Sequence, residues 1–173
     1  MTRDNIIAQF LENASKVAAE PILLRGYDEL NRTLSSILEG SASVYCPAMT
    51  AVEKAIKLPP DRLTTDYASA SACVEEVRGG IAETGSVIST SQDGKIVQAG
   101  LLPPHHVAVV KAENIYETLD DYFATCGDSP PTNITLETGP SRTADIELTL
   151  TIGVHGPERL TILVIAPDAP HVE

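Results

Sequence analysis

The sequence predicts a single α/β domain, with a mostly parallel β-sheet covered by helices on both faces. A chain of 173 residues has room for one core of ordinary size. Segments with helical periodicity alternate with short β-favouring runs, which is typical of α/β folds. The last run, "LTILVI" at 160–165, is apolar on both faces, as expected of a strand inside a parallel sheet.

Two amphipathic helices are predicted near the N-terminus. Apolar residues repeat every three or four positions between 6 and 18, which places them on one stripe of a helix. Leucines and an isoleucine repeat in the same way between 30 and 38, and Gly40 then supplies a stop signal. Each stripe needs a partner surface, so we expect both helices to pack on the sheet.

A third helix is predicted after the β-favouring run "SVYC" at 43–46. Thr50 and Glu53 have the spacing of a capping box, which marks the start of a helix. We expect residues 1–64 to form a helical part that packs on the same single domain as an α/β core at 65–173.

A β-hairpin is predicted from "SVIST" at 86–90 and "KIVQAG" at 95–100, because Asp93 and Gly94 between them favour a tight turn. "HVAVV" at 106–110 is a further strand. The remaining predicted elements are a helix, a strand, a helix and a strand, at 115–123, 133–138, 142–151 and 160–165.

The charge balance argues against polyanionic partners. Twelve basic and twenty-four acidic residues give a net charge of −12, which repels nucleic acid and anionic lipid surfaces. Polar residues interrupt the apolar residues at the N-terminus, unlike in a signal peptide, and no apolar run approaches the roughly 18 residues that span a bilayer. We therefore expect a cytoplasmic protein that contacts neither nucleic acid nor membrane.

The cysteines predict neither a cofactor nor a metal site. Cys46, Cys73 and Cys126 are odd in number, far apart, and form no C-x-x-C pair of the kind that binds zinc or an iron-sulfur cluster. We expect three reduced thiols that act as small buried hydrophobes. Motifs of P-loop, dinucleotide-binding and α/β-hydrolase proteins are also missing from the sequence.

The stretch "TGPSRTADIE" at 138–147 predicts an anion-binding turn. It follows a predicted strand and precedes a predicted helix, so unpaired backbone amides would point outward near Ser141. Arg142 would add a two-pronged charged contact, and Ser141 or Thr143 a hydroxyl. The alternative is that Ser141 only caps the helix while Arg142 is solvated.

Two carboxylates follow this turn. Asp145 and Glu147 are two positions apart, which on a helix separates them by about 200°. They cannot chelate one metal ion from a regular helix. We expect Asp145 to lie in the first helical turn, where the helix dipole stabilises its charge.

Glycines frame a second candidate in "GGIAETGS" at 79–86. Glycines let a backbone turn tightly or approach a ligand closely, so Glu83 between them could act as a general base or nucleophile. The alternative is a surface turn in which Glu83 caps a helix. We expect Glu83 to share a cleft with the turn at 139–143.

Three histidines lie near predicted turns. His105 and His106 are adjacent in a strand, so their side chains point to opposite faces and at most one can face a given site. His155 lies in a tight turn before Gly156 and is our preferred proton shuttle near neutral pH.

Four segments, taken in order, resemble the LUD-domain family of lactate utilisation protein C (LutC-like) proteins: "GIAETGS", "LPPHHVAVV", "TGPSRTADIE" and "GVHGPERLTILVI". The similarity spans roughly residues 65 to 166. It implies a fold similar to the NagB/RpiA/CoA transferase-like group, whose members bind sugar phosphates or CoA esters at strand ends. It also implies a part in oxidising L-lactate to pyruvate, alongside partner subunits that carry iron-sulfur clusters.

The resemblance implies a ligand-binding site at the strand ends, formed by residues of the four motifs. The expected catalytic residues are Glu83 and His155. The expected ligand-binding residues are the motif positions Gly80, Thr84, Gly139, Ser141, Arg142, Thr143, Asp145 and Gly156. Two functions remain open: an accessory component that binds a small anionic carboxylate or phosphate-bearing molecule, or an isomerase- or acyl/CoA-transferase-like enzyme that uses Glu83. A homo-oligomer interface could use some of the same polar segments.

Overall fold

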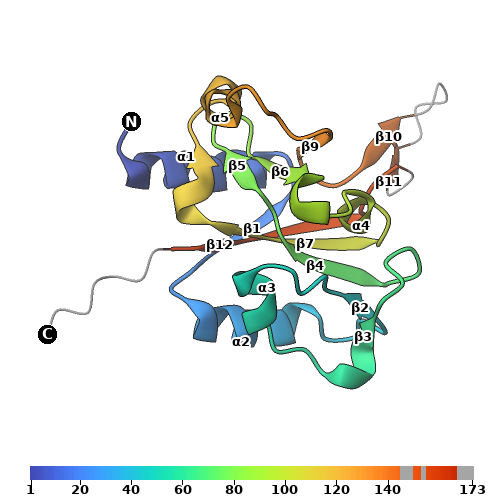
Figure 1. The fold of residues 1–173 in the computed structure, drawn as a ribbon. Helices are drawn as coiled ribbons and strands as arrows, with labels where there is room; N and C mark the ends of the chain where they lie inside the picture. The colour runs from blue at the N-terminus through green and yellow to red at the C-terminus, as the bar shows by residue number, and fades with distance from the viewer. Residues whose placement is uncertain (145–149, 153–154, 167–173) are drawn as a thin grey trace, which may run out of the picture.

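The fold is built on a six-stranded parallel sheet, in a computed structural model that describes residues 1–144, 150–152 and 155–166. The strand order is β1-β12-β7-β4-β2-β3 (Figure 1). The bounds are β1 Glu20–Leu24, β2 Val44–Tyr45, β3 Leu63–Thr64, β4 Ala72–Glu76, β7 His105–Lys111 and β12 Arg159–Ile165. The predicted α/β class with a mostly parallel sheet is confirmed.

Helices cover both faces of this sheet. The helices of the described residues are α1 Arg3–Lys16, α2 Tyr27–Ile37, α3 Ala51–Ala55, α4 Gln98–Leu101 and α5 Leu119–Cys126, with short 3-10 turns η1 Pro60–Arg62, η2 Gln92–Gly94 and η3 Ala112–Asn114. Phe10 of α1 packs in one core cluster with Ala108, while Leu34 of α2 packs in another with Val109. Since neighbours along β7 face opposite sides, the two helices lie on opposite faces (Figure 1).

A second, smaller sheet lies on the α1 side of the first. Its order is β8-β5-β6-β9, with bounds β5 Gly79–Ile81, β6 Ser86–Thr90, β8 Ile115–Tyr116 and β9 Ile134–Glu137. The chain runs almost directly from β4 into β5, so one segment connects the two sheets (Figure 1). A third pairing, β10 Arg142–Ala144 with β11 Leu150–Ile152, is antiparallel.

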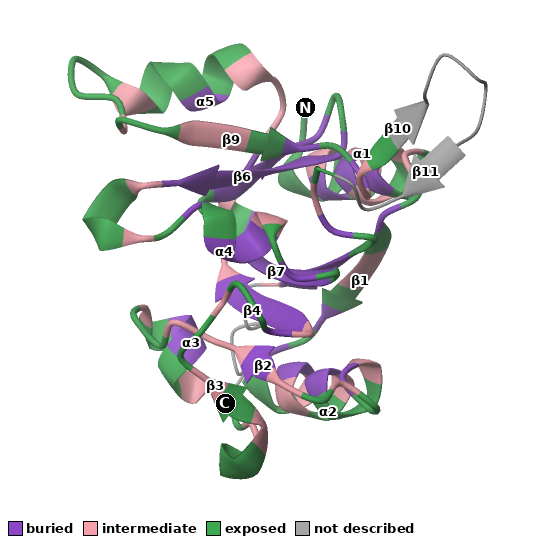
Figure 2. Cartoon of the chain, turned by 90° about the vertical axis from the view of Figure 1, so that its right-hand side faces the viewer, coloured by how far each residue is buried: buried purple, intermediate pink, exposed green. Residues whose placement is uncertain are grey.

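Burial follows this layering. Strands β4 and β7 are buried along almost their whole length, whereas α5 exposes most of its surface (Figure 2). Interior β12 is buried from Leu160 to Ile165, which explains why its sequence is apolar on both faces. None of the helices in the described part of the chain is long and apolar enough to cross a membrane.

Several local predictions are confirmed. The amphipathic stripes form α1 and α2, and the runs at 43–46, 106–110 and 133–138 form strands. Thr50 and Glu53 make the reciprocal hydrogen bonds of a capping box at the start of α3.

The predicted helix at 142–151 is wrong. Residues Arg142–Ala144 and Leu150–Ile152 are the paired strands β10 and β11. Apolar residues stand at every second position, 146, 148, 150 and 152, which is the period of a strand and not of a helix. The turn residues of "GPSRT" therefore do not start a helix, because the sequence that follows them has the period of a strand.

The predicted hairpin through Asp93 and Gly94 is also wrong. Those residues form the 3-10 turn η2, and the "QAG" that follows lies in helix α4. Strand β6 pairs instead with β5, through a turn in which Gly85 has φ +70°. Helix α5 begins later than expected, because Thr118 and Asp121 form a capping box.

Candidate functional site

A groove of about 720 Å³ opens where β9 ends and β12 begins. Residues 135–142 form one wall and residues 155–157 the other, with Lys16, Val17 and Leu101 completing the lining. The Ser141 backbone N–H donates to the Pro157 carbonyl at 2.8 Å, which joins the two walls. The predicted positions Gly139, Ser141, Arg142, His155 and Gly156 are thus brought together.

Basic side chains border this groove. Arg142 and His155 are exposed at its rim. Lys16 lines the groove from the end of α1 and forms an exposed ion pair with Glu12 at 2.7 Å. Glu137 also lines the groove, but its side chain is buried. The rim therefore carries the charged groups of Lys16 and Arg142 and the imidazole of His155, while the Glu137 carboxylate lies in the floor.

Gly139 lets α1 approach the turn closely. Its φ is +79°, a left-handed conformation that favours glycine. A Cβ at this position would overlap the carbonyl oxygen of Val17, the C-cap residue of α1. The opposite wall is also tight, because a Cβ on Gly156 would come within 3.2 Å of the Ser141 Cβ. Both glycines therefore allow the walls of the groove to pack closely against their neighbouring segments.

The groove lacks the helix that the sequence predicted at its edge. Arg142 begins strand β10, and Thr143 follows it in the same strand. Any anion held here must therefore be bound by side chains and turn amides, without a helix dipole. Asp145 and Glu147 lie outside the described residues.

Glu83 and Gly80 do not line this groove. Glu83 is exposed, and its carboxylate accepts a 2.8 Å hydrogen bond from the Leu119 backbone N–H at the start of α5. This is the capping arrangement that the sequence left open, and the expected shared cleft is not formed. Gly80 lies in β5, where a Cβ would come within 2.7 Å of the Phe10 ring. Its role is to let α1 pack on the second sheet.

A short chain of hydroxyl groups connects the Glu83 turn to the groove. The Thr84 and Ser86 hydroxyls lie 2.7 Å apart, and Ser86 lies 2.7 Å from the Thr138 hydroxyl. Thr138 lines the groove. The two loop motifs are therefore physically linked, although only one of them forms the groove.

A buried ionic cluster, which we call the His106 cluster, joins the two sheets. His106 Nδ1 lies 2.9 Å from Glu137 Oε1 and His106 Nε2 lies 3.4 Å from Glu75 Oε1. All three side chains are buried. Glu137 comes from β9 of the smaller sheet, whereas His106 and Glu75 come from β7 and β4 of the larger one.

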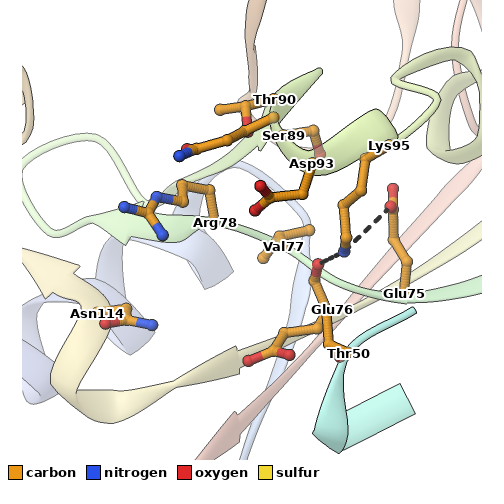
Figure 3. A pocket seen from close by; sticks show the side chains of 11 residues that line it. Thr50, Glu75, Glu76, Val77, Arg78, Ser89, Thr90, Asp93, Lys95 and Asn114 are labelled. Atoms are coloured by element: carbon orange, nitrogen blue, oxygen red, sulfur yellow. Dashed lines mark hydrogen bonds and ion pairs between the residues drawn. The ribbon is translucent and has the colours of Figure 1, made fainter. Parts of the chain in front are cut away.

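The cluster continues to a small polar pocket at the carboxyl end of β4. Lys95 Nζ lies 2.9 Å from Glu53 Oε1. It also lies 3.9 Å from Glu75 Oε2 and donates to the Glu76 carbonyl (Figure 3). This pocket of about 140 Å³ is lined by Arg78 and Lys95 as well as by acidic and hydroxyl side chains. An unbroken series of charged groups thus runs from the groove floor to this pocket.

Sequence reasoning missed the His106 cluster, although one signal pointed to it. Glu75 and His106 stand next to apolar residues in the strand sequences "ACVEE" and "HHVAVV". Charged side chains are rarely fully buried unless they are paired. Two such residues in neighbouring strands therefore predict a buried ion pair, but only once the strand order is known.

The family follows from the comparison of sequences. The LUD domain family profile matches residues 60–165, which is more than half of the chain. The chain belongs to the LUD-domain family. The resemblance that the four motifs indicated is confirmed.

Relatives of this LUD domain include an uncharacterized protein of Neisseria meningitidis serogroup B, 39% identical over 51% of this chain and 40% of the relative. Another is named lactate utilization protein C, from Halalkalibacterium halodurans, and is 33% identical over 49% of this chain and 40% of that protein. The chain thus matches about two fifths of the length of these relatives. A crystal structure of a DUF162 family protein from Deinococcus radiodurans shares the fold, with a TM-score of 0.69 and 22% identity over 95% of this chain and 99% of that one.

The two adjacent histidines of this LUD domain differ in protonation. Burial opposes charge on His106, but the Glu137 and Glu75 carboxylates outweigh it and raise the pKa of His106 to about 10. Burial, together with the nearby Arg159 guanidinium, lowers the pKa of His105 to about 4. His105 Nε2 lies 2.9 Å from the Thr161 hydroxyl. Near neutral pH, His106 is therefore charged and His105 is neutral.

His105 is expected to make the LUD domain sensitive to acid. Its pKa is lowered on folding from 6.5 to about 4, so its contribution to stability is present above pH 6.5 and lost as the pH falls toward 4. In the wild type, the urea midpoint should fall between pH 6.5 and 4. His105→Gln keeps a polar group near Thr161, and its midpoint should fall less over the same pH range. A variant whose midpoint falls as steeply as that of the wild type would contradict this role.

Proposed function

We propose that this LUD-domain chain serves lactate utilisation by binding a small carboxylate in the groove between residues 135–142 and 155–157. The names of relatives such as lactate utilization protein C support the pathway. The single observation that carries the ligand class is that Lys16, Arg142 and His155 all line one groove. In a chain of net charge −12, three basic side chains gathered at one groove favour an anionic ligand.

The side chains of the groove suit a short hydroxy- or keto-acid. A guanidinium presents parallel N–H groups that match the two oxygens of a carboxylate, so Arg142 would hold the acid group. Ser141 and Thr138 would offer hydroxyls to the rest of the ligand, and His155 would exchange a proton with its hydroxyl oxygen. Lys16 would add charge at the rim.

We propose an accessory role beside cytoplasmic partner subunits that carry the iron-sulfur clusters. Binding a carboxylate orients it but does not remove its electrons, so oxidation of lactate needs an electron acceptor supplied by a partner. Co-purification of the chain with iron-sulfur proteins from cells grown on lactate, and not from cells grown on glucose, tests this partnership.

The alternative is an isomerase- or acyl/CoA-transferase-like enzyme with Glu83 as base or nucleophile. The geometry supports it less well, because the Glu83 carboxylate accepts a hydrogen bond from Leu119 and does not line the groove. Turnover of a CoA ester that is lost in Glu83→Gln, with folding preserved, would favour this alternative.

Arg142→Ala is expected to weaken lactate and pyruvate binding by at least about tenfold. One charge-assisted hydrogen bond contributes roughly 1.5 to 3 kcal/mol, and 1.4 kcal/mol corresponds to tenfold in affinity. Arg142→Lys should recover only part of the loss, because an ammonium cannot make the two-pronged contact. Calorimetric titration at fixed ionic strength measures these affinities.

Arg32→Ala provides the matched control. Arg32 is an exposed arginine of α2, on the opposite face of the larger sheet from α1. Its removal changes the net charge by the same amount as Arg142→Ala but leaves the groove intact. If both alanine variants bind lactate as well as the wild type, the groove is not the carboxylate site.

A further inference from the structure

Three buried donor atoms converge inside the His106 cluster. Cys73 Sγ, a carboxylate oxygen of Glu75 and a ring nitrogen of His106 lie within 4.8 Å of one another, and all three residues are buried. They come from adjacent parallel strands, since Cys73 is directly opposite His106 in the β4–β7 pairing. Glu75 is two positions further along β4, so the three side chains share one face of the sheet.

Two buried polar atoms of these residues have no hydrogen-bond partner in the described part of the chain. They are His106 Nε2 and Glu75 Oε1, which face each other at 3.4 Å without forming a hydrogen bond. An unsatisfied buried polar atom costs about 1 to 3 kcal/mol. Without a metal ion, only the proton of the charged imidazole lies between these two atoms, and the contact is long at 3.4 Å. A metal ion that replaced this proton would bond to both atoms.

The separation fits a metal ion and excludes a water molecule. Two bonds of about 2.1 Å, as zinc makes to nitrogen and oxygen, span 3.4 Å at an angle of about 110°, which is tetrahedral. A bridging water would need about 2.7 Å to each atom, so its angle would be only about 80°. Cys73 Sγ lies within 4.8 Å of a donor atom on each of the other two residues, so a shift of at most about 1 Å would let it complete the set.

The surroundings of the three donors match those of known metal centres. A metal-binding histidine usually donates its second ring N–H to a carboxylate, and His106 Nδ1 lies 2.9 Å from Glu137. Gly100 leaves the required space open, because a Cβ there would come within 2.9 Å of Glu75 Oε1 and 3.0 Å of His106 Nε2. The glycine thus keeps a side chain out of the space next to the facing donor atoms.

We propose that Cys73, Glu75 and His106 bind a divalent transition-metal ion, with zinc the best match, and that Glu137 orients the histidine. The ion would replace the Nε2 proton of His106 and the thiol proton of Cys73, both of which are released to solvent. Thiolate, carboxylate and imidazole are the ligand types that zinc prefers. No spacing motif indicates this site, because Cys73 and His106 are brought together only by the pairing of β4 with β7. The bound ion would hold His106 of β7 in place, and the contact of His106 with Glu137 would connect the larger sheet to β9.

The test uses cobalt as a spectroscopic substitute for zinc. The purified chain is stripped with a chelator, dialysed, and titrated with Co²⁺ alone. The expected result is one bound ion per chain, with the strong visible bands of tetrahedral cobalt and a thiolate-to-cobalt charge-transfer band. Added Zn²⁺ should remove these bands. A wild-type chain that binds no cobalt, or binds it without the thiolate band, would overturn the proposal.

Variants assign the ligands. Cys73→Ser should abolish the thiolate band, whereas the control Cys46→Ser, at a half-buried cysteine outside the donor set, should keep it. Glu137→Gln should keep the band but weaken cobalt binding by about 10- to 100-fold, as expected of a group that only orients a ligand. If Cys46→Ser loses the band and Cys73→Ser keeps it, the site is elsewhere. Circular dichroism of each variant confirms that it is folded.

Discussion

Replacing His106 with alanine is expected to destabilise the fold by about 3 to 5 kcal/mol, the range for removing one partner of a buried ion pair. Glu75 and Glu137 are 4% and 7% exposed, so both carboxylates would lose their central cation without gaining water. The free energy of unfolding from urea denaturation measures the loss. His155→Ala, at an exposed histidine of the groove, should change it by no more than about 0.5 kcal/mol.

The pH dependence of this difference, measured on chelator-treated protein without bound metal, tests the cause. The pKa of His106 is raised on folding from 6.5 to about 10, so its charged form stabilises the fold fully below pH 6.5. That contribution is lost as the pH rises through 10. The gap between wild type and His106→Ala should therefore narrow between pH 6.5 and 10. A constant gap would show that lost packing, and not lost charge, destabilises the variant.

Gly139→Ala is expected to cost about 2 to 5 kcal/mol. A left-handed backbone costs about 1 to 2 kcal/mol with a side chain present, and overpacking adds about 1 to 3 kcal/mol. Both apply here, because φ is +79° and the new methyl group would overlap the Val17 carbonyl. The shift in urea midpoint, converted with an unchanged denaturant slope, gives the cost.

Gly40→Ala separates the two contributions. Gly40 also has a positive φ, +87°, but a Cβ there would have nothing within 4 Å. Its substitution should therefore cost only the backbone term of about 1 to 2 kcal/mol. Equal losses in the two variants would mean that α1 shifts easily and that the groove wall is not rigid.

The larger sheet was predictable because its signals are local. A run that is apolar on both faces, such as 160–165, is typical of an interior strand of a parallel sheet. The apolar stripes of α1 and α2 need a surface to pack on, which the sheet provides. The groove was partly predictable, since the motifs of "GPSRT" and "GVHGPE" are each visible in the sequence. What joins them is the Ser141–Pro157 hydrogen bond, which depends on where β9 and β12 lie.

The rest depended on contacts between distant segments. The sequence "GGIAETGS" is compatible with Glu83 as a base. It does not reveal that the Leu119 N–H of α5, a distant segment, donates to the Glu83 carboxylate. The helix predicted in place of β10 and β11 rested on turn residues that resemble a helix cap. The alternation of apolar and polar residues that follows them indicates strands. Cys73 and His106 become neighbours only through the pairing of β4 with β7.

Strand β12 has a consequence for how the protein is made. It is the last strand of the described chain, yet it lies between β1 and β7 in the sheet, and it places Glu20 beside a residue 141 positions later. During synthesis, the edges of β1 and β7 that pair with β12 therefore stay unpaired until β12 leaves the ribosome. Such contacts between distant segments slow folding, and exposed strand edges favour aggregation. Truncation before β12 should leave a product that depends on chaperones and does not close its sheet.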